Sequence, residues 1–398
     1  MAPLLPPPPT CPSGRTRAAL ATASLLVFGA LCAAPASADI TVGFVTSLSG
    51  NGSSLGIPYA RGMAAALAYK SEIGGEKLTI IQLDDTSDPS AASRDARKLI
   101  EENHVDVLIG SATAPATIAM AQVATELKVP MIALSPVPIA GTTPEQWMVA
   151  VPQPASLLVK VVADRMKRDH MEKVAYIGFS DAWGDLVYAG AKAAEAEGGL
   201  TILTNERYTR SDSSVTGQAL KIMATHPQAI LIGGSGTQGA LPLLNLAPLG
   251  FHGSAYGPAS LVNQDFIRVG GKAVEGIQVS TGPVIVAEQL PDDHYARKIS
   301  LAFREAYLKA NGAPTSDGFS AYSFDGWLIL LTAAKQALQV AKPGTPEFHA
   351  ALDDAIFKIH ELAGTQGVYN FTRGQNYGVD DRAVVIVRLV DGKWTYAP

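Results

Sequence analysis

The chain has 398 residues, which is enough for two or three domains of ordinary size. Hydrophobic residues make up 47% and charged residues 17%, a balance that allows a large core and excludes a disordered chain. There are 31 lysines and arginines against 36 acidic residues. The formal net charge of −5, with no basic block, argues against nucleic acid as the main partner.

The first 38 residues have the pattern of a secretory signal peptide. Arg15 and Arg17 supply positive charge, residues 18–34 form an uncharged apolar run, and Ala36-Ser37-Ala38 fits a small-residue cleavage signal. The run is short and weakly hydrophobic for a membrane anchor. We therefore expect export to the periplasm, with Asp39 as the first mature residue.

Cysteine content narrows the possible chemistry. Cys11 and Cys32 both fall in the leader, so the exported chain would carry no thiol and no disulfide. This excludes cysteine nucleophiles, cysteine-based zinc sites and iron–sulfur clusters. Lipid attachment at Cys32 stays open, although Leu31 is bulkier than the small residue that lipoprotein signals prefer. The seven histidines form no metal motif, and we expect neither a metal nor a cofactor.

From Ile40 onward, short apolar runs alternate with amphipathic segments. The predicted strands of the first half are residues 40–45, 78–83, 105–109 and 131–134, and the predicted helices are residues 59–73, 90–102 and 115–127. Because the strands are apolar almost throughout, they indicate a doubly wound parallel sheet in an α/β protein, buried on both faces.

After Pro152-Gln153-Pro154 the pattern restarts. The second set of predicted strands is residues 174–179, 200–208, 229–233 and 254–256, with helices at 157–168, 186–197, 217–225 and 238–247. The C-terminal third contains predicted helices at 295–311, 322–340 and 347–359 and strands at 382–389 and 394–396. Two α/β units of this size are each long enough to bury a core.

Three motifs suggest chemistry that their context does not support. Gly234-Ser235-Gly236-Thr237-Gln238-Gly239 matches a dinucleotide fingerprint, but no acid follows the next strand at residues 256–259 to bind a ribose. A serine-hydrolase elbow would need glycine at Thr237. The acidic run 84–88 lacks the glycine and the distant glutamate of a calcium loop, so we expect Asp88 to begin a turn or a helix. We identify no catalytic residue.

The strongest chemical signal is the strand-to-helix junction at residues 109–115. Ser111 and Thr113 carry small hydroxyl groups, and the helix start would offer free backbone N–H groups to an anion. Capping of the helix by Thr113 explains the same residues. Ser135 follows the next strand, and ligands of such sheets bind at the carboxyl ends of strands. Trp183, after a strand of the second unit, either covers an apolar ligand or belongs to the core.

At these residues the chain resembles the periplasmic substrate-binding proteins of the leucine/isoleucine/valine-binding family, type I of the fold, which feed ABC importers. The resemblance covers residues 39–398. Its matching segments are residues 40–50, Arg61-Gly62, and residues 83–86, 107–111, 129–132 and 273–277.

The resemblance implies two doubly wound lobes joined by three crossovers, which close on a ligand. It divides the chain into lobe 1, at residues 39–153 plus 282–362, and lobe 2, at residues 154–281 plus 363–398. The ligand-binding residues that it implies are Ser111, Ala112, Thr113, Ser135, Trp183, Ser235, Gly236, Ala259 and Tyr322. Of these, the junction at 111–113 and Ser135 would hold a carboxylate.

One departure from the family concerns the ligand. The family's amino-acid binders hold the ammonium with an acid two residues after a glycine, but the segment here is Gly257-Pro258-Ala259. Burying an ammonium without a counter-charge costs on the order of several kcal/mol. We therefore predict that the ligand is a small apolar carboxylate without an amine, either an aromatic or a branched aliphatic acid.

The predicted partners are this ligand and the membrane permease of an ABC importer, and we expect a monomer. Hydrophobic amino acids stay open as ligands, with Asp181 or Asp185 as substitute partners for the amine. An exported enzyme of the same fold would need a nucleophile–base pair or a metal cluster, and we find neither. A sensor that works through a separate partner also stays open.

Overall fold

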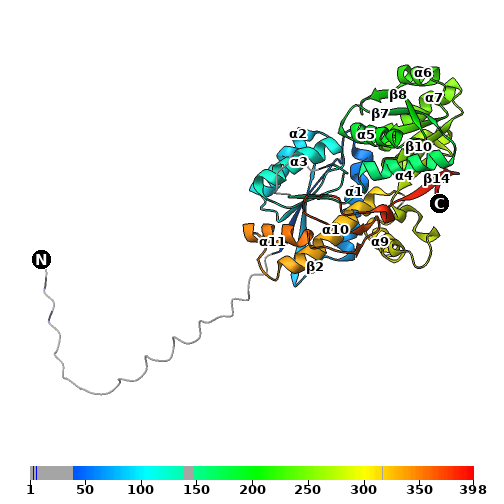
Figure 1. Ribbon diagram of the computed structural model, residues 1–398. Helices are drawn as coiled ribbons and strands as arrows, with labels where there is room; N and C mark the ends of the chain where they lie inside the picture. Colours follow the sequence, from blue (N-terminus) through cyan, green and yellow to red (C-terminus); the bar gives the residue numbers. More distant parts are fainter. Residues whose placement is uncertain (1–2, 4–5, 7–38, 139–146, 316) are drawn as a thin grey trace. The chain divides into compact units, whose positions relative to one another are not determined.

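The part of the chain that follows the leader folds into two large sheets, each flanked by helices (Figure 1). The computed structural model describes residues 3, 6, 39–138, 147–315 and 317–398. Residues Ala38–Pro398 form one compact unit. The predicted signal peptide lies outside the described residues, apart from residues 3 and 6.

The first sheet has the strand order β2-β3-β1-β4-β5-β6 and is parallel except for the β2–β3 pair. Its strands are β1 (Ile40–Thr46), β2 (Glu72–Ile73), β3 (Glu76–Asp84), β4 (Val107–Gly110), β5 (Met131–Ala133) and β6 (Met148–Ala150). Helices α2 (Pro89–Glu101) and α3 (Ala114–Leu127) cover one face, and α1 (Ser53–Tyr69), α10 (Phe319–Ala337) and α11 (Pro346–Ile356) cover the other. Helix α9 (Tyr295–Asn311) packs on α1.

The second sheet has the order β15-β14-β11-β10-β9-β7-β8. Its strands are β7 (Lys173–Phe179), β8 (Thr201–Tyr208), β9 (Ala229–Gly233), β10 (Ser254–Pro258), β11 (Gln278–Thr281), β14 (Val385–Val390) and β15 (Lys393–Tyr396). The first five are parallel, and β14 and β15 are antiparallel to their neighbours. The helices of this lobe are α4 (Ala155–Arg168), α5 (Ala182–Ala196), α6 (Thr216–Ala224), α7 (Leu241–Leu246) and α8 (Gln264–Gly270).

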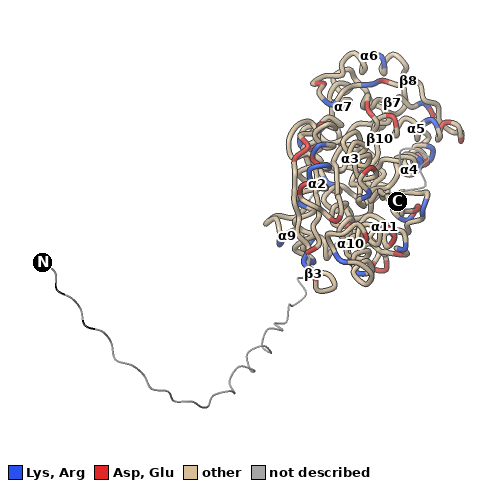
Figure 2. Tube along the Cα trace, turned by 90° about the vertical axis from the view of Figure 1, so that its left-hand side faces the viewer, with Lys and Arg blue, Asp and Glu red and all other residues tan. Residues whose placement is uncertain are grey.

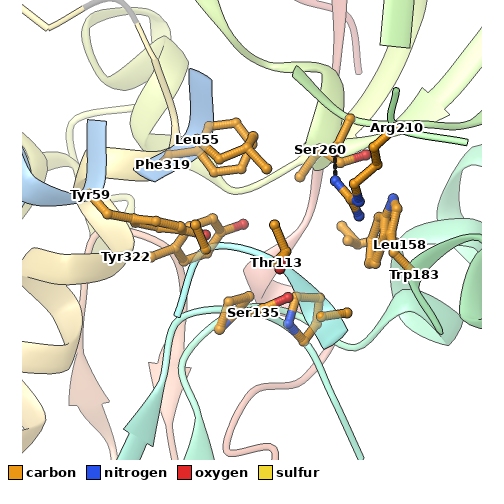
Figure 3. A pocket seen from close by; sticks show the side chains of 16 residues that line it. Leu55, Tyr59, Thr113, Ser135, Leu158, Trp183, Arg210, Ser260, Phe319 and Tyr322 are labelled. Carbon is orange, nitrogen blue, oxygen red and sulfur yellow. Dashed lines mark hydrogen bonds between the residues drawn. The ribbon is translucent and has the colours of Figure 1, made fainter. Parts of the chain in front are cut away.

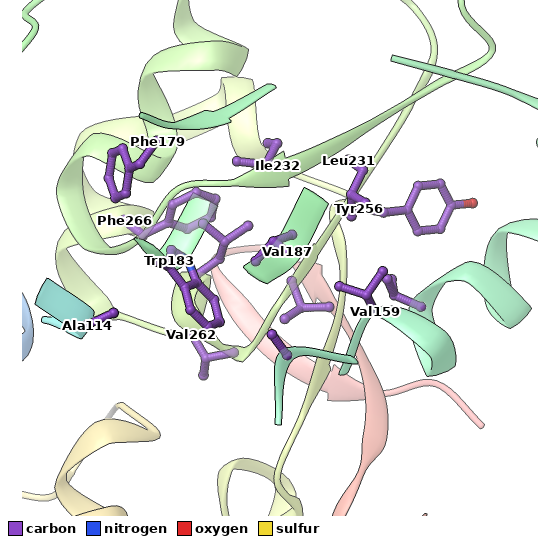
Figure 4. Packing of buried hydrophobic residues seen from close by; sticks show 14 of the residues in the cluster. Ala114, Val159, Phe179, Trp183, Val187, Leu231, Ile232, Tyr256, Val262 and Phe266 are labelled. Atoms are coloured by element: carbon purple, nitrogen blue, oxygen red, sulfur yellow. The ribbon is translucent and has the colours of Figure 1, made fainter. Parts of the chain in front are cut away.

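The core of the second lobe uses both faces of β9. Successive residues of a strand point to opposite faces. Leu231 lies beside Val159 of α4, whereas Ile232 lies toward Phe179 and Phe266 of α8 (Figure 4). Both residues are almost fully buried. Burial on both faces explains why this strand is apolar throughout, and the two sheets confirm the predicted α/β fold with two lobes.

The first helix differs from its prediction at both ends. Helix α1 runs from Ser53 to Tyr69, so the predicted range of 59–73 was wrong. Ile73 belongs to β2 instead, and the turn at Gly74-Gly75, with φ of 64° and 92°, joins β2 to β3 as a hairpin. Pro58 lies inside the helix. Because proline has no N–H, the carbonyl of Ser54 lacks its usual partner in the helix.

The helix predicted at 238–247 is also interrupted. A 3-10 turn (Gly236–Ala240) comes first and α7 (Leu241–Leu246) follows. Asp88 accepts a hydrogen bond from the backbone N–H of Ala91 and caps α2, which confirms its predicted place at a helix start.

The chain crosses between the lobes three times: after β6, after β11 to reach α10 and α11 on the first sheet, and again before β14. Gln153, in the first crossing, donates from Nε2 to the carbonyls of Gln366 (2.9 Å) and Ala383 (2.8 Å), which flank the last crossing. The predicted division of the chain at residues 362 and 363 remains a prediction. Tyr369 packs in the core of the first lobe, and Tyr377 pairs with β6, so these contacts favour a later division.

Charged residues of both signs are interspersed along both lobes (Figure 2). None of the helices in the described part of the chain is long and apolar enough to cross a membrane.

Candidate functional site

A pocket lies between the two lobes, where the carboxyl ends of strands from both sheets face each other. Its empty space, including the solvent at its mouth, is about 450 Å³. The first lobe and the first crossing contribute Leu55, Tyr59, Ala112, Thr113, Ala114, Ser135, Pro136, Pro152, Phe319 and Tyr322 to its lining. The second lobe contributes Leu158, Trp183, Arg210, Ser235, Ala259 and Ser260 (Figure 3).

Seven of the nine predicted site residues line this pocket, and Ser111 and Gly236 do not. The Ser111 hydroxyl is buried and bonds to the carboxylate of Asp85. Gly236 has a φ of 52°, and a Cβ atom there would lie 2.3 Å from the Ser54 hydroxyl. Gly236 therefore lies where α1 of the first lobe touches the second, and its lack of a side chain permits that approach.

The start of α3 forms the floor of the pocket. Thr113 caps the helix, because its Oγ1 accepts a hydrogen bond from the N–H of Ala116 (3.4 Å). The backbone N–H groups of Thr113 and Ala114 donate to no group in the described part of the chain. Together with the positive end of the helix dipole, they are suited to hold an anion. Ser135, after β5, places a hydroxyl beside them.

Aromatic rings make the wall on the side of the first lobe (Figure 3). The Tyr59 hydroxyl donates to the carbonyl of Leu134 (2.6 Å), and the Tyr322 hydroxyl donates to Oε1 of Gln153 (2.6 Å). Burial raises the pKa of both phenols, so they stay neutral. Phe319 meets Tyr59 edge-on, with ring centroids 5.6 Å apart. This wall is apolar and carries no charge.

Trp183 belongs mainly to the core of the second lobe. Its side chain packs near Val262 and Phe266, and only 5% of the residue is exposed (Figure 4). Its Nε1 donates to the carbonyl of Gly234 (3.2 Å). The core alternative is thus confirmed, and because Trp183 also lines the pocket, its contact with a ligand stays a prediction.

Of the described lining residues one is charged, Arg210, and the sequence did not predict it. It follows β8, so its position at the carboxyl end of a strand was the available signal. The other lining residues that were not predicted are Leu55, Tyr59, Ala114, Pro136, Pro152, Leu158, Ser260 and Phe319.

Among the described residues, no carboxylate lines the pocket. Ala259, directly after Gly257-Pro258, lines the pocket with a methyl group. Asp181 accepts hydrogen bonds from Arg210 and from the N–H groups of Trp183 and Gly184. Asp185 is exposed and pairs with Arg207 (3.0 Å). Neither aspartate is placed to balance a buried ammonium.

The family model described as "Periplasmic binding protein" matches residues 39–393. The chain belongs to this family. Periplasmic binding proteins are substrate-binding receptors of transport systems, and the pocket between two lobes is consistent with such a role.

Known periplasmic binding proteins resemble the chain over most of its length. An extracellular ligand-binding receptor from Rhodopseudomonas palustris HaA2 is 39% identical, with a TM-score of 0.86 over 91% of this chain and 100% of that one. "Leu/Ile/Val-binding protein homolog 7" of Brucella abortus (strain 2308) is 24% identical over 91% of this chain and 92% of the relative.

A third relative was solved with a ligand. It is a solute-binding protein of an ABC transporter from R. palustris in complex with benzoate, 20% identical, with a TM-score of 0.73 over 90% of this chain and 95% of that one. At this level of identity the likeness shows the shared fold alone.

Proposed function

We propose that the protein is the periplasmic receptor of an ABC importer and that it captures a small apolar carboxylate, either an aromatic or a branched aliphatic acid, between its two lobes. In this proposal the leader is removed near Ala38, the receptor acts as a monomer, and it passes its ligand to the permease without chemical change.

The observation that carries the proposal is the charge of the lining. The lining that the described residues form has apolar walls, one arginine and no carboxylate. A carboxylate ligand would find free N–H donors at Thr113 and Ala114, whereas an ammonium would be buried without a counter-charge. The benzoate complex of the relative from R. palustris supports an aromatic acid, because it shows that this fold accommodates one.

Hydrophobic amino acids are the second candidate. The names of the relatives in Brucella favour leucine, isoleucine or valine, and the same floor of N–H groups would hold the α-carboxylate of an amino acid. The two candidates differ in one group, the amine, so the decisive comparison uses ligands that differ only there.

The test is a thermal-shift and calorimetric titration with leucine, 4-methyl-2-oxopentanoate and benzoate. Leucine and the oxo acid share a carbon skeleton, so the pair isolates the ammonium. We expect stabilisation by the oxo acid or by benzoate and none by leucine at equal concentration. A ligand at about 100 times its Kd should stabilise the protein by about 2.7 kcal/mol. Stabilisation by leucine alone would favour the second candidate, and no response to any of the three would contradict both.

A further inference from the structure

Arg210 enters the pocket from the second lobe, on the side of Trp183 and Leu158, across from Tyr59 and Tyr322 (Figure 3). It is largely buried, with 15% of its side chain exposed. A buried arginine that faces a cavity is unusual unless its donors are used, because a guanidinium is costly to remove from water. Its hydrogen bonds therefore indicate what it can still bind.

Three contacts fix the position of the guanidinium. Its Nε donates to Oδ2 of Asp181 (2.7 Å), and Nη1 donates to the Ser235 hydroxyl (3.0 Å). Its central carbon lies 4.2 Å from the centroid of the Phe179 ring. Asp181 is itself held by two backbone N–H groups at the start of α5. The arginine is thus preorganised before any ligand arrives.

The second terminal nitrogen, Nη2, donates to no group in the described part of the chain. It is therefore available to a ligand in the pocket. The free N–H groups of Thr113 and Ala114 belong to the first lobe, whereas this donor belongs to the second. In the lining that the structure describes, the one unused cationic donor thus faces the same cavity as the amides of α3.

We propose that Arg210 determines selectivity for anions: its Nη2 binds the ligand's carboxylate from the second lobe while the start of α3 binds it from the first. This inference rests on the proposed function and deepens it. The carboxylate then links the two lobes directly. A neutral ligand of the same shape would leave the Nη2 donor without a charged acceptor, and so would close the lobes less favourably.

The test compares benzoate with benzamide, which has the same ring and a neutral head group. We expect Arg210→Gln to weaken benzoate binding about 10- to 100-fold, the range for loss of a charge-assisted hydrogen bond, and to change benzamide binding less than about threefold. Arg210→Lys keeps the charge without the planar fork and should lose less benzoate affinity. Affinities come from calorimetry on the exported form of the protein.

Arg207→Gln serves as the matched control. Arg207 precedes Arg210 by three residues and lies over the rings of Tyr176 and Tyr188 outside the pocket lining, so benzoate affinity should stay unchanged. If Arg210→Gln lost affinity for benzoate and for benzamide equally, the role of Arg210 would be structural and the inference would be overturned. Unchanged benzoate affinity in that variant would also overturn it and leave the proposed function intact. Failure of wild-type protein to bind any acid would overturn both.

Discussion

Ala259 begins a 3-10 turn (Ala259–Leu261) directly after β10, and its methyl group lines the pocket. At the scale of single residues, the electrostatics of the pocket depend on this small side chain and on Arg210. An acid at 259 would introduce into the lining the negative charge that an ammonium needs. The alanine instead leaves the arginine as the one charged side chain that the described residues offer a ligand there.

Replacing Ala259 with glutamate should reverse the preference of the pocket. The new carboxylate would repel an acid and attract an ammonium, so we expect benzoate affinity to fall at least tenfold, about 1.4 kcal/mol, and leucine affinity to rise relative to it. Ala259→Gln is the control, since it adds a side chain of the same size without charge. Calorimetry with both ligands measures the change. A larger loss for leucine than for benzoate would contradict the amine-free proposal.

At the scale of elements, the irregularity of α1 connects the two lobes. Pro58 leaves the Ser54 carbonyl without a helical donor, and Nδ2 of Asn263, from the second lobe, donates to it (2.5 Å). The N–H of Thr237 donates to the Ser54 hydroxyl across the same contact (3.4 Å). A local defect in one helix thus becomes a hydrogen-bonding site for the other lobe.

The substitution Asn263→Asp should remove the hydrogen bond to Ser54 and keep the cap of α8. Oδ1 of Asn263 accepts hydrogen bonds from the N–H groups of Asp265 and Phe266 at the start of α8, and an aspartate can do the same. The aspartate has no N–H for Ser54, so we expect about fivefold weaker binding of benzoate with little change in the free energy of unfolding. Asn263→Ala should lose both the contact with Ser54 and the cap of α8. Loss of the cap should lower the free energy of unfolding by about 1 kcal/mol. Wild-type affinity in the aspartate variant would refute the linking role of this contact.

At the scale of the whole molecule, Asp325 ties a helix of the first lobe to the segment that leads into the last crossing. Its carboxylate accepts hydrogen bonds from the N–H and hydroxyl of Thr365, the N–H of Gln366 and the hydroxyl of Tyr369, at 2.8 to 2.9 Å. The residue is fully buried. Burial raises the pKa of Asp325 to about 6, although these hydrogen bonds act to lower it.

The raised pKa of Asp325 predicts a pH-dependent stability. Because the folded protein holds this proton more tightly than the unfolded chain, the carboxyl favours folding most below about pH 4, and the contribution is lost as pH rises to about 6. The free energy of unfolding of wild type minus that of Asp325→Asn should therefore fall by about 2 kcal/mol between pH 4 and 7, at about 1.4 kcal/mol per pKa unit.

Urea denaturation at several pH values measures this difference. Asp391→Asn is the control, because Asp391 is exposed and has a positive φ of 51°, which asparagine tolerates. A comparable fall for this variant would indicate a general effect of pH rather than one of the Asp325 carboxyl. If the difference in free energy of unfolding between wild type and Asp325→Asn stayed level or rose with pH, it would contradict a raised pKa for Asp325.

Long periodic segments were predicted well, because the spacing of their apolar residues repeats several times within the segment. Helix α9 begins and ends where its pattern predicts. Strands β6 and β11 were missed, whereas β4 and β5 are equally short and were predicted, because each of those two directly follows a predicted helix. The end of α1 was wrong because the pairing of β2 with β3 takes up Ile73, and its start was wrong because the helix continues through Pro58 to Ser53.

By itself, the sequence determined the α/β class, the two units and the strand-to-helix junction at Thr113, because periodicity, apolar strands and helix starts are properties of neighbouring residues. Only the tertiary structure decided which side chains share the pocket: Arg210 from one lobe, and Tyr59 and Phe319 from the other. Segments far apart in the chain come together there because whole sheets pack and the chain crosses between the lobes three times. A pattern of neighbouring residues does not predict such contacts.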